Sequence, residues 1–355
     1  MSEPTRDKAI DIMRGIAIIM VFIVHYGQTF GTPMITKFGQ MGCQLFFFAS
    51  GYVCCYSYQR CKDVRCFIKK RFLSIAPAFY LALTIIVIAN NLYRTVHGVP
   101  FVGRGNTGLI SVLCNYALIH GVMPFCYNNV FPGGWFIGTL FILYLLHPCI
   151  MKVMSGTKRK WLLTISVMCF GALIALTVNY LLTGTIYIKN DSFAYYLFCN
   201  QLCSYLLGIL CFLVRNNLKT VKMRIVAYLA VIMLLLTVLV FYSSLELKYV
   251  LIPPLMGFHA FFLFLFLGRL QLRGKMCRGL ALLGTNSFYI YLVHMVVVWT
   301  AAEYLKNAFM KVCCNNINVA LFAVLFPCII LTFLLVICFK IILKPIMSLF
   351  SRTIS

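Results

Sequence analysis

Long runs of apolar residues repeat along the whole chain, and short polar segments separate them. A helix needs about 20 residues to cross the hydrocarbon core of a membrane, and the apolar runs reach that length. The pattern therefore predicts a bundle of about ten transmembrane helices. The predicted spans cover residues 10–30, 39–59, 71–91, 133–152, 161–182, 192–214, 224–243, 249–268, 283–304 and 318–343.

The segments between the predicted spans are too short for a separate soluble domain. Hydrophobic residues make up 62% of the chain and charged residues only 11%, and the mean hydropathy is +0.94. We therefore expect residues 1–355 to form one all-α, polytopic membrane domain. The first run is full-length and bulky residues follow it, so we expect it to stay as a membrane anchor rather than be removed as a signal peptide.

The chain is strongly basic, with a net charge of +24, but the basic residues alternate between connections. Of the 31 Lys and Arg residues, 24 fall in the two termini or in every second connection, and 7 fall in the opposite connections. Basic loops remain in the cytoplasm. The charge therefore predicts cytoplasmic N- and C-termini with an even number of spans, rather than a nucleic-acid ligand.

Two ionisable residues, Arg14 and His25, interrupt the first apolar run. An arginine inside a spanning segment costs roughly 2.5 to 3.5 kcal/mol on insertion scales, so a charge there suggests a functional site. Eleven residues along a helix return to within about 20° of the starting face, so both side chains share one face. The structural alternative is that Arg14 extends to the cytoplasmic interface while His25 hydrogen-bonds to a neighbouring helix.

A second intramembrane histidine, His294, falls in the predicted span 283–304, about 15 Å from the cytoplasmic side. Ser287 and Tyr291 precede it at spacings of seven and three residues, which place all three side chains on one helical face. We expect a continuous polar edge there, deep in the bundle.

Basic residues also mark the start of the third span. Lys70 and Arg71 lie at the predicted cytoplasmic interface, where they can bind a phosphorylated ligand. Earlier basic residues of the same loop, such as Lys62, are explained by topology alone. In the second span, Ser50 and Gly51 form a small site where another helix can approach closely.

Trp135 follows a proline and two glycines at the start of the fourth span. We expect it at the outer membrane interface, although an aromatic ring at a cavity mouth can also stack on a sugar. Polar residues of the outer connection 92–132 are candidates for contacting an outside substrate, and solvation of the loop explains them equally well. They are Arg104, Asn106, Asn115 and His120.

Other histidines and the cysteines receive mainly structural interpretations. His147 is interpreted as a capping or interface histidine. His259 follows Pro253 and Pro254, which should break or bend their helix and free backbone groups that need internal partners. The 17 cysteines show no metal-binding spacing, so we expect no metal site. A disulfide is feasible only for the cysteines of predicted outer segments, which are Cys114, Cys126, Cys313 and Cys314.

These pieces, in this order, resemble the acyltransferase 3 family of bacterial integral-membrane acyltransferases over nearly the whole chain. The most specific element of the family is an arginine followed after ten residues by a histidine, met here by Arg14 and His25 within IDIMRGIAIIMVFIVH. The other matching segments are LFFFASGY, KKRFLSIAP, FPGGWFIG and YLVH. Each motif is weak alone, and the ordered set is specific.

The chain departs from the family pattern at two positions. Ser74 stands where the family usually has a second arginine, which argues against a two-arginine clamp at the start of the third span. Leu140 stands where many relatives have a glutamate, so that acid takes no part here. The family often carries a C-terminal extracytoplasmic hydrolase-like domain, and this sequence ends just after the tenth predicted span.

The resemblance implies a multi-pass enzyme of the bacterial cytoplasmic (inner or plasma) membrane. It would transfer an acyl group, commonly acetyl, from cytoplasmic acyl-CoA to a hydroxyl of a cell-surface or lipid-linked glycan. Acetyl-CoA would then be a co-substrate, and no bound cofactor is expected. Arg14, Lys70 and Arg71 place cations where the phosphates of such a donor would bind.

In the same interpretation, His25 is the general base on the acceptor hydroxyl, because an imidazole titrates near working pH. His294 would orient His25, bind the acceptor or stabilise the developing oxyanion. Direct transfer is simpler than an acyl-enzyme on a histidine or serine. The residues expected to contact the substrate are Ser50, Trp135, Ser287 and Tyr291.

Two other functions fit the same residues. An exporter or flippase for a polysaccharide or lipid-linked sugar would use the buried cations to bind an anionic glycan without covalent change, and acyl-CoA consumption separates it from the enzyme. A structural partner in a glycan-assembly complex would tolerate replacement of the buried histidines. The enzyme is the prediction we carry forward.

Overall fold

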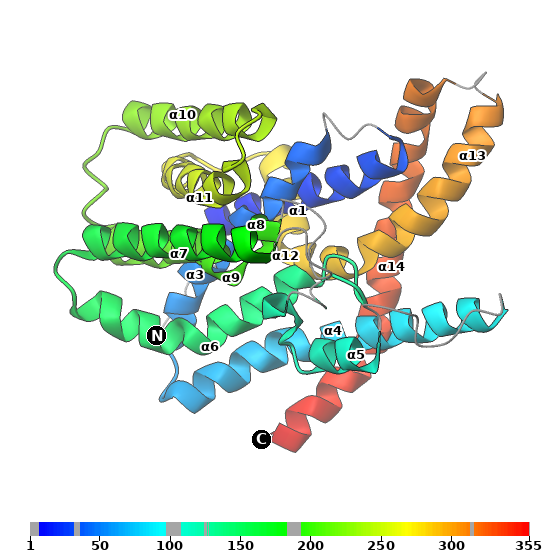
Figure 1. Ribbon diagram of the computed structural model, residues 1–355, viewed down its shortest axis with the longest axis horizontal. Coiled ribbons are helices and arrows are strands. Elements are labelled where there is room, and N and C mark those ends of the chain that lie inside the picture. The colour runs from blue at the N-terminus through cyan, green and yellow to red at the C-terminus, as the bar shows by residue number, and fades with distance from the viewer. Residues whose placement is uncertain are drawn as a thin grey trace. The chain divides into compact units, whose positions relative to one another are not determined.

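The computed structural model describes residues 7–31, 36–96, 108–123, 126, 128–182, 193–312 and 316–354, and every regular element in these residues is a helix (Figure 1). The all-α prediction is therefore confirmed for the described chain. Eight helical stretches are long and apolar enough to cross a membrane, as a polytopic membrane protein requires. They are Lys8–Thr29, Val64–Tyr93, Trp135–Gly156, Lys160–Leu181, Met223–Tyr242, Lys248–Leu267, Lys275–Val312 and Ile317–Phe350.

The two remaining predicted spans coincide with shorter helices. Residues 39–59 overlap α3 (Gly42–Gln59), and residues 192–214 overlap α9 (Phe198–Val214), an apolar helix of 17 residues. The count of about ten spans and the cytoplasmic position of both termini therefore stay predictions.

The chain divides into two compact units, and both α3 and α4 (Val64–Val96) contribute to each. Unit 1 comprises Met1–Cys43, Pro77–Ala82 and Leu272–Ser355, and unit 2 comprises Gln44–Ala76 and Leu83–Gln271. The other elements of unit 1 are α1 (Lys8–Thr29), η1 (Lys37–Met41), α12 (Lys275–Val296), η3 (Val297–Ala302), α13 (Glu303–Val312) and α14 (Ile317–Ile354). The other elements of unit 2 are α5 (Leu109–Tyr116), η2 (His120–Val122), α6 (Trp135–Gly156), α7 (Lys160–Leu182), α8 (Phe193–Tyr196), α9, α10 (Met223–Tyr242) and α11 (Lys248–Leu267).

In unit 1, α1 and α12 pack so closely that glycine is required at the contact. A Cβ atom at Gly284 would collide with the carbonyl of Asp11, and one at Gly15 would collide with the carbonyl of Leu280. Small residues let helix backbones approach where lipid offers no hydrophobic drive for association. This crossing fixes α1, which carries Arg14 and His25, against α12, which carries His294.

The C-terminal part of α1 is held by an apolar cluster within unit 1. Tyr26 also donates a hydrogen bond from its hydroxyl to the carbonyl of Leu321 on α14, at 2.6 Å. The buried members of the cluster are Phe22, Tyr26, Phe30, Val297, Val298, Ala302, Ala320, Val324 and Cys328. The helix turn that bears His25 is therefore fixed from two sides, by η3 and by α14.

In unit 2, glycines allow a similar backbone contact between α3 and α9. A Cβ atom at Gly51 would collide with the carbonyl of Tyr205, and one at Gly208 would collide with the carbonyl of Phe48. The prediction that another helix approaches closely at Ser50 and Gly51 is confirmed, and the approaching helix is α9.

Helix α11 continues through Pro253 and Pro254, so the double proline does not break the helix, and a bend there stays a prediction. Pro253 has no N–H for the carbonyl of Tyr249, four residues earlier. The Asn200 amide on α9 donates to that carbonyl at 3.0 Å. An internal partner therefore replaces the missing hydrogen bond, as expected for a backbone group freed inside a membrane.

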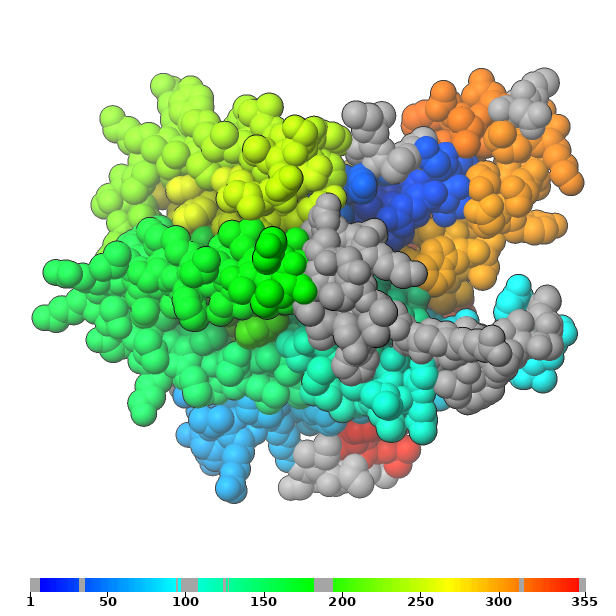
Figure 2. Space-filling view, in the orientation of Figure 1, coloured from blue at the N-terminus to red at the C-terminus, as the bar shows by residue number. Residues whose placement is uncertain are grey.

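Helices α7 and α10 in unit 2 leave most of their apolar side chains exposed. Only 22% of the most apolar window of each helix is buried, with Leu173 and Leu239 among the exposed residues. Both helices lie on the face drawn in Figure 2. Exposed leucines on helices of this length suit contact with lipid tails.

The connection between α4 and α6 contains the short helix α5. His120 is fully buried and donates from Nε2 to the carbonyl of Gly134 at 2.7 Å. Burial lowers the pKa of His120 to about 4. This histidine is therefore neutral near pH 7, and its hydrogen bond to Gly134 holds the connection against the start of α6.

Asn115 is likewise buried and donates to the carbonyl of Ser111 at 2.8 Å. Asn115 and His120 are therefore both engaged inside the protein, and contact of either residue with an outside substrate stays a prediction. Arg104 and Asn106 lie outside the described residues, as do Cys313 and Cys314. Cys114 and Cys126 are buried with free thiols, so the structure contains no disulfide between them.

Candidate active site

The two intramembrane histidines meet in unit 1. The ring centroids of His25 and His294 are 5.3 Å apart, with an angle of 45° between the ring planes. On both helices the glycine contacts come before the histidine contact along the chain. The two helices therefore run parallel. His25 is half-buried and His294 is 1% exposed.

Local hydrogen bonds fix which nitrogen of each ring carries the proton. His294 donates from Nδ1 to the carbonyl of Tyr291 at 2.8 Å, and the carbonyl of Ile290 lies 3.2 Å away. His25 donates from Nδ1 to the side-chain oxygen of Gln28 at 3.2 Å. A carbonyl only accepts hydrogen bonds, so the neutral form of each ring has its lone pair on Nε2. Nε2 of His294 is buried and has no hydrogen-bond partner.

The predicted polar edge of α12 is present. Ser287, Tyr291 and His294 are all buried, and the rings of Tyr291 and His294 have centroids 5.7 Å apart. The Ser287 hydroxyl donates to the carbonyl of Gly284 at 2.8 Å, within its own helix. Ser287 therefore offers a ligand its oxygen lone pairs rather than its proton.

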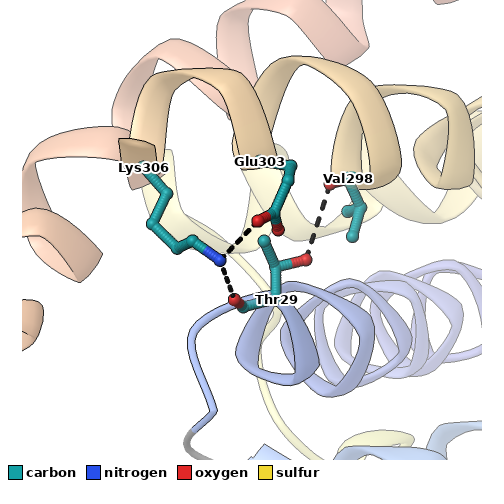
Figure 3. A network of polar contacts seen from close by, with 4 residues as sticks. All are labelled: Thr29, Val298, Glu303 and Lys306. Carbon is teal, nitrogen blue, oxygen red and sulfur yellow. Dashed lines mark hydrogen bonds and ion pairs between the residues drawn. The ribbon is translucent and has the colours of Figure 1, made fainter. Parts of the chain in front are cut away.

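A polar network holds the end of α1 one turn after His25 (Figure 3). The Lys306 ammonium donates to the carbonyl of Thr29 at 2.9 Å and forms an ion pair with Glu303 at 2.6 Å. The Thr29 hydroxyl donates to the carbonyl of Val298 at 3.5 Å. A cation at a helix C-terminus is favourable, because the last carbonyls carry partial negative charge.

The π-helical turn η3 begins at Val297, three residues after His294. Single π-helical turns occur often at functional sites, since they displace the following side chains from regular α-helical spacing. Here the turn packs Val298 and Ala302 into the cluster that supports α1. Arg14 is half-buried and lies on the same continuous helix as His25. Because α1 is continuous between them, the two residues share one helical face, as predicted.

The second group of predicted residues lies in unit 2. The Arg71 guanidinium is partly buried and packs over the rings of Phe67 and Tyr144, at 5.9 Å and 5.7 Å from their centroids. Its Nη1 donates to Cys54 Sγ at 3.9 Å, and its Nε has no hydrogen-bond partner. No carboxylate of the described residues forms an ion pair with it. Lys70, the preceding residue, is exposed.

His147 is the functional candidate that sequence reasoning missed. It lies inside α6 and does not cap it, and its side chain is fully buried in unit 2. Its Nδ1 lies 3.0 Å from the Tyr205 hydroxyl, its ring stacks on Phe67 at 5.1 Å, and its Nε2 has no hydrogen-bond partner. A single histidine in an apolar run gives no sign of its neighbours, so only the fold reveals this group.

A cavity of about 560 Å³ lies where α3 ends, α4 begins and α6 ends, within unit 2. The lining includes two lysines, Lys62 and Lys152, and one acid, Asp63. The full lining is Tyr58, Gln59, Cys61, Lys62, Asp63, Val64, Met151, Lys152 and Ser155. Asp63 accepts from the backbone N–H of Cys66 at 2.7 Å and so caps the start of α4. The sequence analysis explained Lys62 by membrane topology alone, and the structure places it in the lining of this cavity.

Trp135, the first residue of α6, is 6% exposed, and its position at the outer membrane interface stays a prediction. Its ring contacts Tyr196 and Tyr195 edge-on, at 5.1 Å and 5.8 Å between centroids. The Tyr195 hydroxyl donates to the Gln44 side chain at 3.0 Å, within a buried polar network. Ser50 is half-buried. Substrate contact by Ser50 and Trp135 stays a prediction.

The fold and these residues define a class: a polytopic, helical membrane protein with an intramembrane histidine pair and a partly buried arginine that has no ion pair with an acid of the described residues. No group of metal-binding side chains occurs among the residues that the structure describes. A family model described as an acyltransferase domain matches residues 7–340, nearly the whole chain. The chain therefore belongs to the acyltransferase 3 family and is a membrane acyltransferase. No curated protein and no solved structure matches it.

Proposed function

We propose that this protein transfers an acyl group, most commonly acetyl, from cytoplasmic acyl-CoA to a hydroxyl of a cell-surface or lipid-linked glycan. The observation that carries the proposal is the His25–His294 pair, because each ring has its Nδ1 proton engaged and its Nε2 lone pair available. Two proton acceptors inside an apolar bundle suit the activation of a hydroxyl.

His25 acts as the general base. Its Nε2 takes the proton of the acceptor hydroxyl while the hydroxyl oxygen attacks the thioester carbonyl of the donor. The tetrahedral intermediate collapses, the C–S bond breaks, and the imidazolium returns its proton to the departing thiolate of coenzyme A. General-base assistance of this kind contributes about 10² to 10⁴ in rate.

His294 binds or orients the acceptor hydroxyl in this mechanism. In its neutral form the unpartnered Nε2 is an acceptor, so it can receive a hydrogen bond from a hydroxyl but cannot donate one to an oxyanion. This favours acceptor positioning over oxyanion stabilisation. Ser287 and Tyr291, on the same face of α12, extend the acceptor site.

Cations supply the donor site. Arg14, Lys70 and Arg71 bind the phosphates of coenzyme A, and Arg71 is the best supported because no carboxylate of the described chain neutralises it. Charge-assisted hydrogen bonds to phosphate are the strongest that such side chains form.

The protein belongs, in this proposal, to the bacterial cytoplasmic membrane, with ten spans and both termini in the cytoplasm. The 24 to 7 distribution of basic residues motivates this topology. A single thiol placed near Lys158 in a cysteine-depleted background should react only with a reagent that reaches the cytoplasm. Labelling of that thiol from outside would contradict the topology.

The function itself is tested by donor consumption. Membranes that contain the protein, supplied with radiolabelled acetyl-CoA and cell-envelope glycan, should release coenzyme A and transfer label to the glycan. A polysaccharide exporter or flippase would instead move glycan without consuming the thioester. Unchanged acyl-CoA in membranes that do alter glycan transport would overturn the enzyme assignment.

A further inference from the structure

Unit 2 contains two buried nitrogen atoms that lack hydrogen-bond partners and belong to side chains with a common neighbour. Arg71 Nε and His147 Nε2 are both buried and unpartnered. The two residues share one neighbour, because the Arg71 guanidinium packs over the Phe67 ring and the His147 ring stacks on it. A buried polar group without a partner costs about 1 to 3 kcal/mol, so such pairs are kept where a ligand completes them.

Both nitrogens are donors. The Nε of a guanidinium always carries a proton. For His147, the Tyr205 hydroxyl lies 3.0 Å from Nδ1. We take Tyr205 as the donor of this hydrogen bond, because a phenol is more acidic than a neutral imidazole N–H. The proton of the neutral ring is then on Nε2, which points an N–H group away from Tyr205.

Resting on the function proposed above, we propose that Arg71 and His147 bind one phosphate-type oxyanion of the donor, with Tyr205 fixing the tautomer of His147. Two N–H donors, one of them on a cation, match two oxygens of a single phosphate group.

A cavity of about 560 Å³ is separated from this pair by one side chain. Tyr58 lines the cavity, and its ring meets the rings of Phe67 and His147 edge-on, at 5.4 Å and 5.8 Å between centroids. Lys62 and Lys152, both exposed, line the same cavity together with Asp63. In the proposal, the donor enters from this cavity and a displacement of Tyr58 admits its phosphate to Arg71 and His147.

Phosphate chemistry has two sources in a membrane, the donor nucleotide and an anionic lipid headgroup. Binding should therefore be measured by titration calorimetry on the full chain in nanodiscs of zwitterionic phosphatidylcholine. The ligands are coenzyme A, dephospho-coenzyme A and pantetheine, which carries no phosphate. A second set of nanodiscs contains phosphatidylglycerol.

The variants are Arg71→Gln, His147→Phe and the double variant, with His147→Gln retaining an N–H donor. His259→Gln is the matched control, because His259 is another buried histidine of unit 2 but is satisfied by the carbonyl of Ala230 at 2.8 Å. Each single loss should weaken coenzyme A binding by about 10-fold or more, while pantetheine binding and the control stay unchanged. His147→Gln should retain part of the affinity.

If the double variant loses no more coenzyme A affinity than one single variant does, the two residues bind one shared phosphate, because residues that hold the same group are coupled. Comparison with dephospho-coenzyme A identifies which phosphate of the donor is bound. Additive losses, or coenzyme A affinity unchanged in both single variants, would overturn the proposal. If the variants change only the response to phosphatidylglycerol and leave coenzyme A binding unchanged, the bound phosphate belongs to a lipid and not to the donor. Acyl-CoA turnover by the same Arg71→Gln protein would show that the proposed enzyme function survives such a failure.

Discussion

Units 1 and 2 both use glycine to bring helices into backbone contact, yet the polar groups they bury differ. In unit 1 the helices joined at Gly284 bring His25 and His294 together, and each ring has its Nδ1 bonded within its own helix. In unit 2 Arg71 Nε and His147 Nε2 are buried without a hydrogen-bond partner. Our proposals therefore assign proton abstraction to the histidines of unit 1 and phosphate binding to the cation and histidine of unit 2.

The strongest way to break this comparison is to remove the base of unit 1. His25→Gln and His25→Asn keep hydrogen bonding but cannot accept a proton near neutral pH, so the rate of acyl transfer should fall about 10² or more. The measurement is initial rate at saturating acetyl-CoA, with protein abundance and thermal stability measured beside it, because loss of folded protein imitates loss of catalysis.

His259→Gln is the control, as a buried histidine with a purely interhelical hydrogen bond. It should retain most of the activity if folded. Near wild-type rates in folded His25→Gln protein would remove His25 as the base, and His294→Gln and His294→Asn would then be the next substitutions to test.

The donor side is tested by Arg14→Ala and Arg71→Ala. Loss of a charge-assisted phosphate contact should cost about 1.5 to 3 kcal/mol, which is roughly 10- to 150-fold in apparent donor affinity. Lys158→Ala, which removes an exposed basic residue, is the matched control. The apparent KM for acetyl-CoA measures the effect. Identical donor dependence in all three variants would remove both arginines from the site.

A glycine pair on α12 tests whether close packing builds unit 1. Gly284→Ala places a methyl group into the backbone of α1 and should reduce the free energy of unfolding by roughly 1 to 3 kcal/mol. Gly279→Ala on the same helix meets nothing within 4 Å and should be neutral or slightly stabilising. Thermal unfolding of both proteins in detergent gives the comparison, and equal melting temperatures would contradict the packing account.

The smallest predicted effect is a pH dependence from His120. Burial lowers its pKa to about 4, so the unfolded chain binds this proton more readily than the folded chain does. The stabilisation is complete above the unfolded pKa of about 6.5 and is lost as pH falls towards 4. Between pH 7 and pH 5.5 the loss should be about 1 kcal/mol. His120→Gln should lack this component, and the same pH slope in both proteins would contradict it.

Most of the fold could be predicted from apolar periodicity, because lipid forces nearly every spanning segment to be a helix. Each predicted run coincides with a helix, and Gly51 marks a real close contact. The need for an internal partner at the double proline could be predicted, but the sequence does not reveal that Asn200, from another helix, replaces the lost hydrogen bond. The burial of Trp135 could not be predicted, because an exposed interface tryptophan and a buried one have the same sequence context.

The candidate site could be predicted where its residues lie on one helix or match a family motif. Ser287, Tyr291 and His294 follow from helical spacing, and Arg71 from its position beside an apolar run. His147 could not be predicted, since its role depends on Arg71 and Tyr205, which are distant in the sequence. Contacts between helices carry that information, and a single sequence does not contain them.

The central claim is that this chain acylates a cell-envelope glycan through His25. Mass spectrometry of surface glycans from cells with the wild-type protein, with His25→Gln, and without the protein tests it most directly. The account predicts a mass increment of one acyl group per modified sugar, 42 Da for acetyl, only in wild-type cells. Glycans of identical mass in all three samples, with each protein folded and expressed where present, would contradict it.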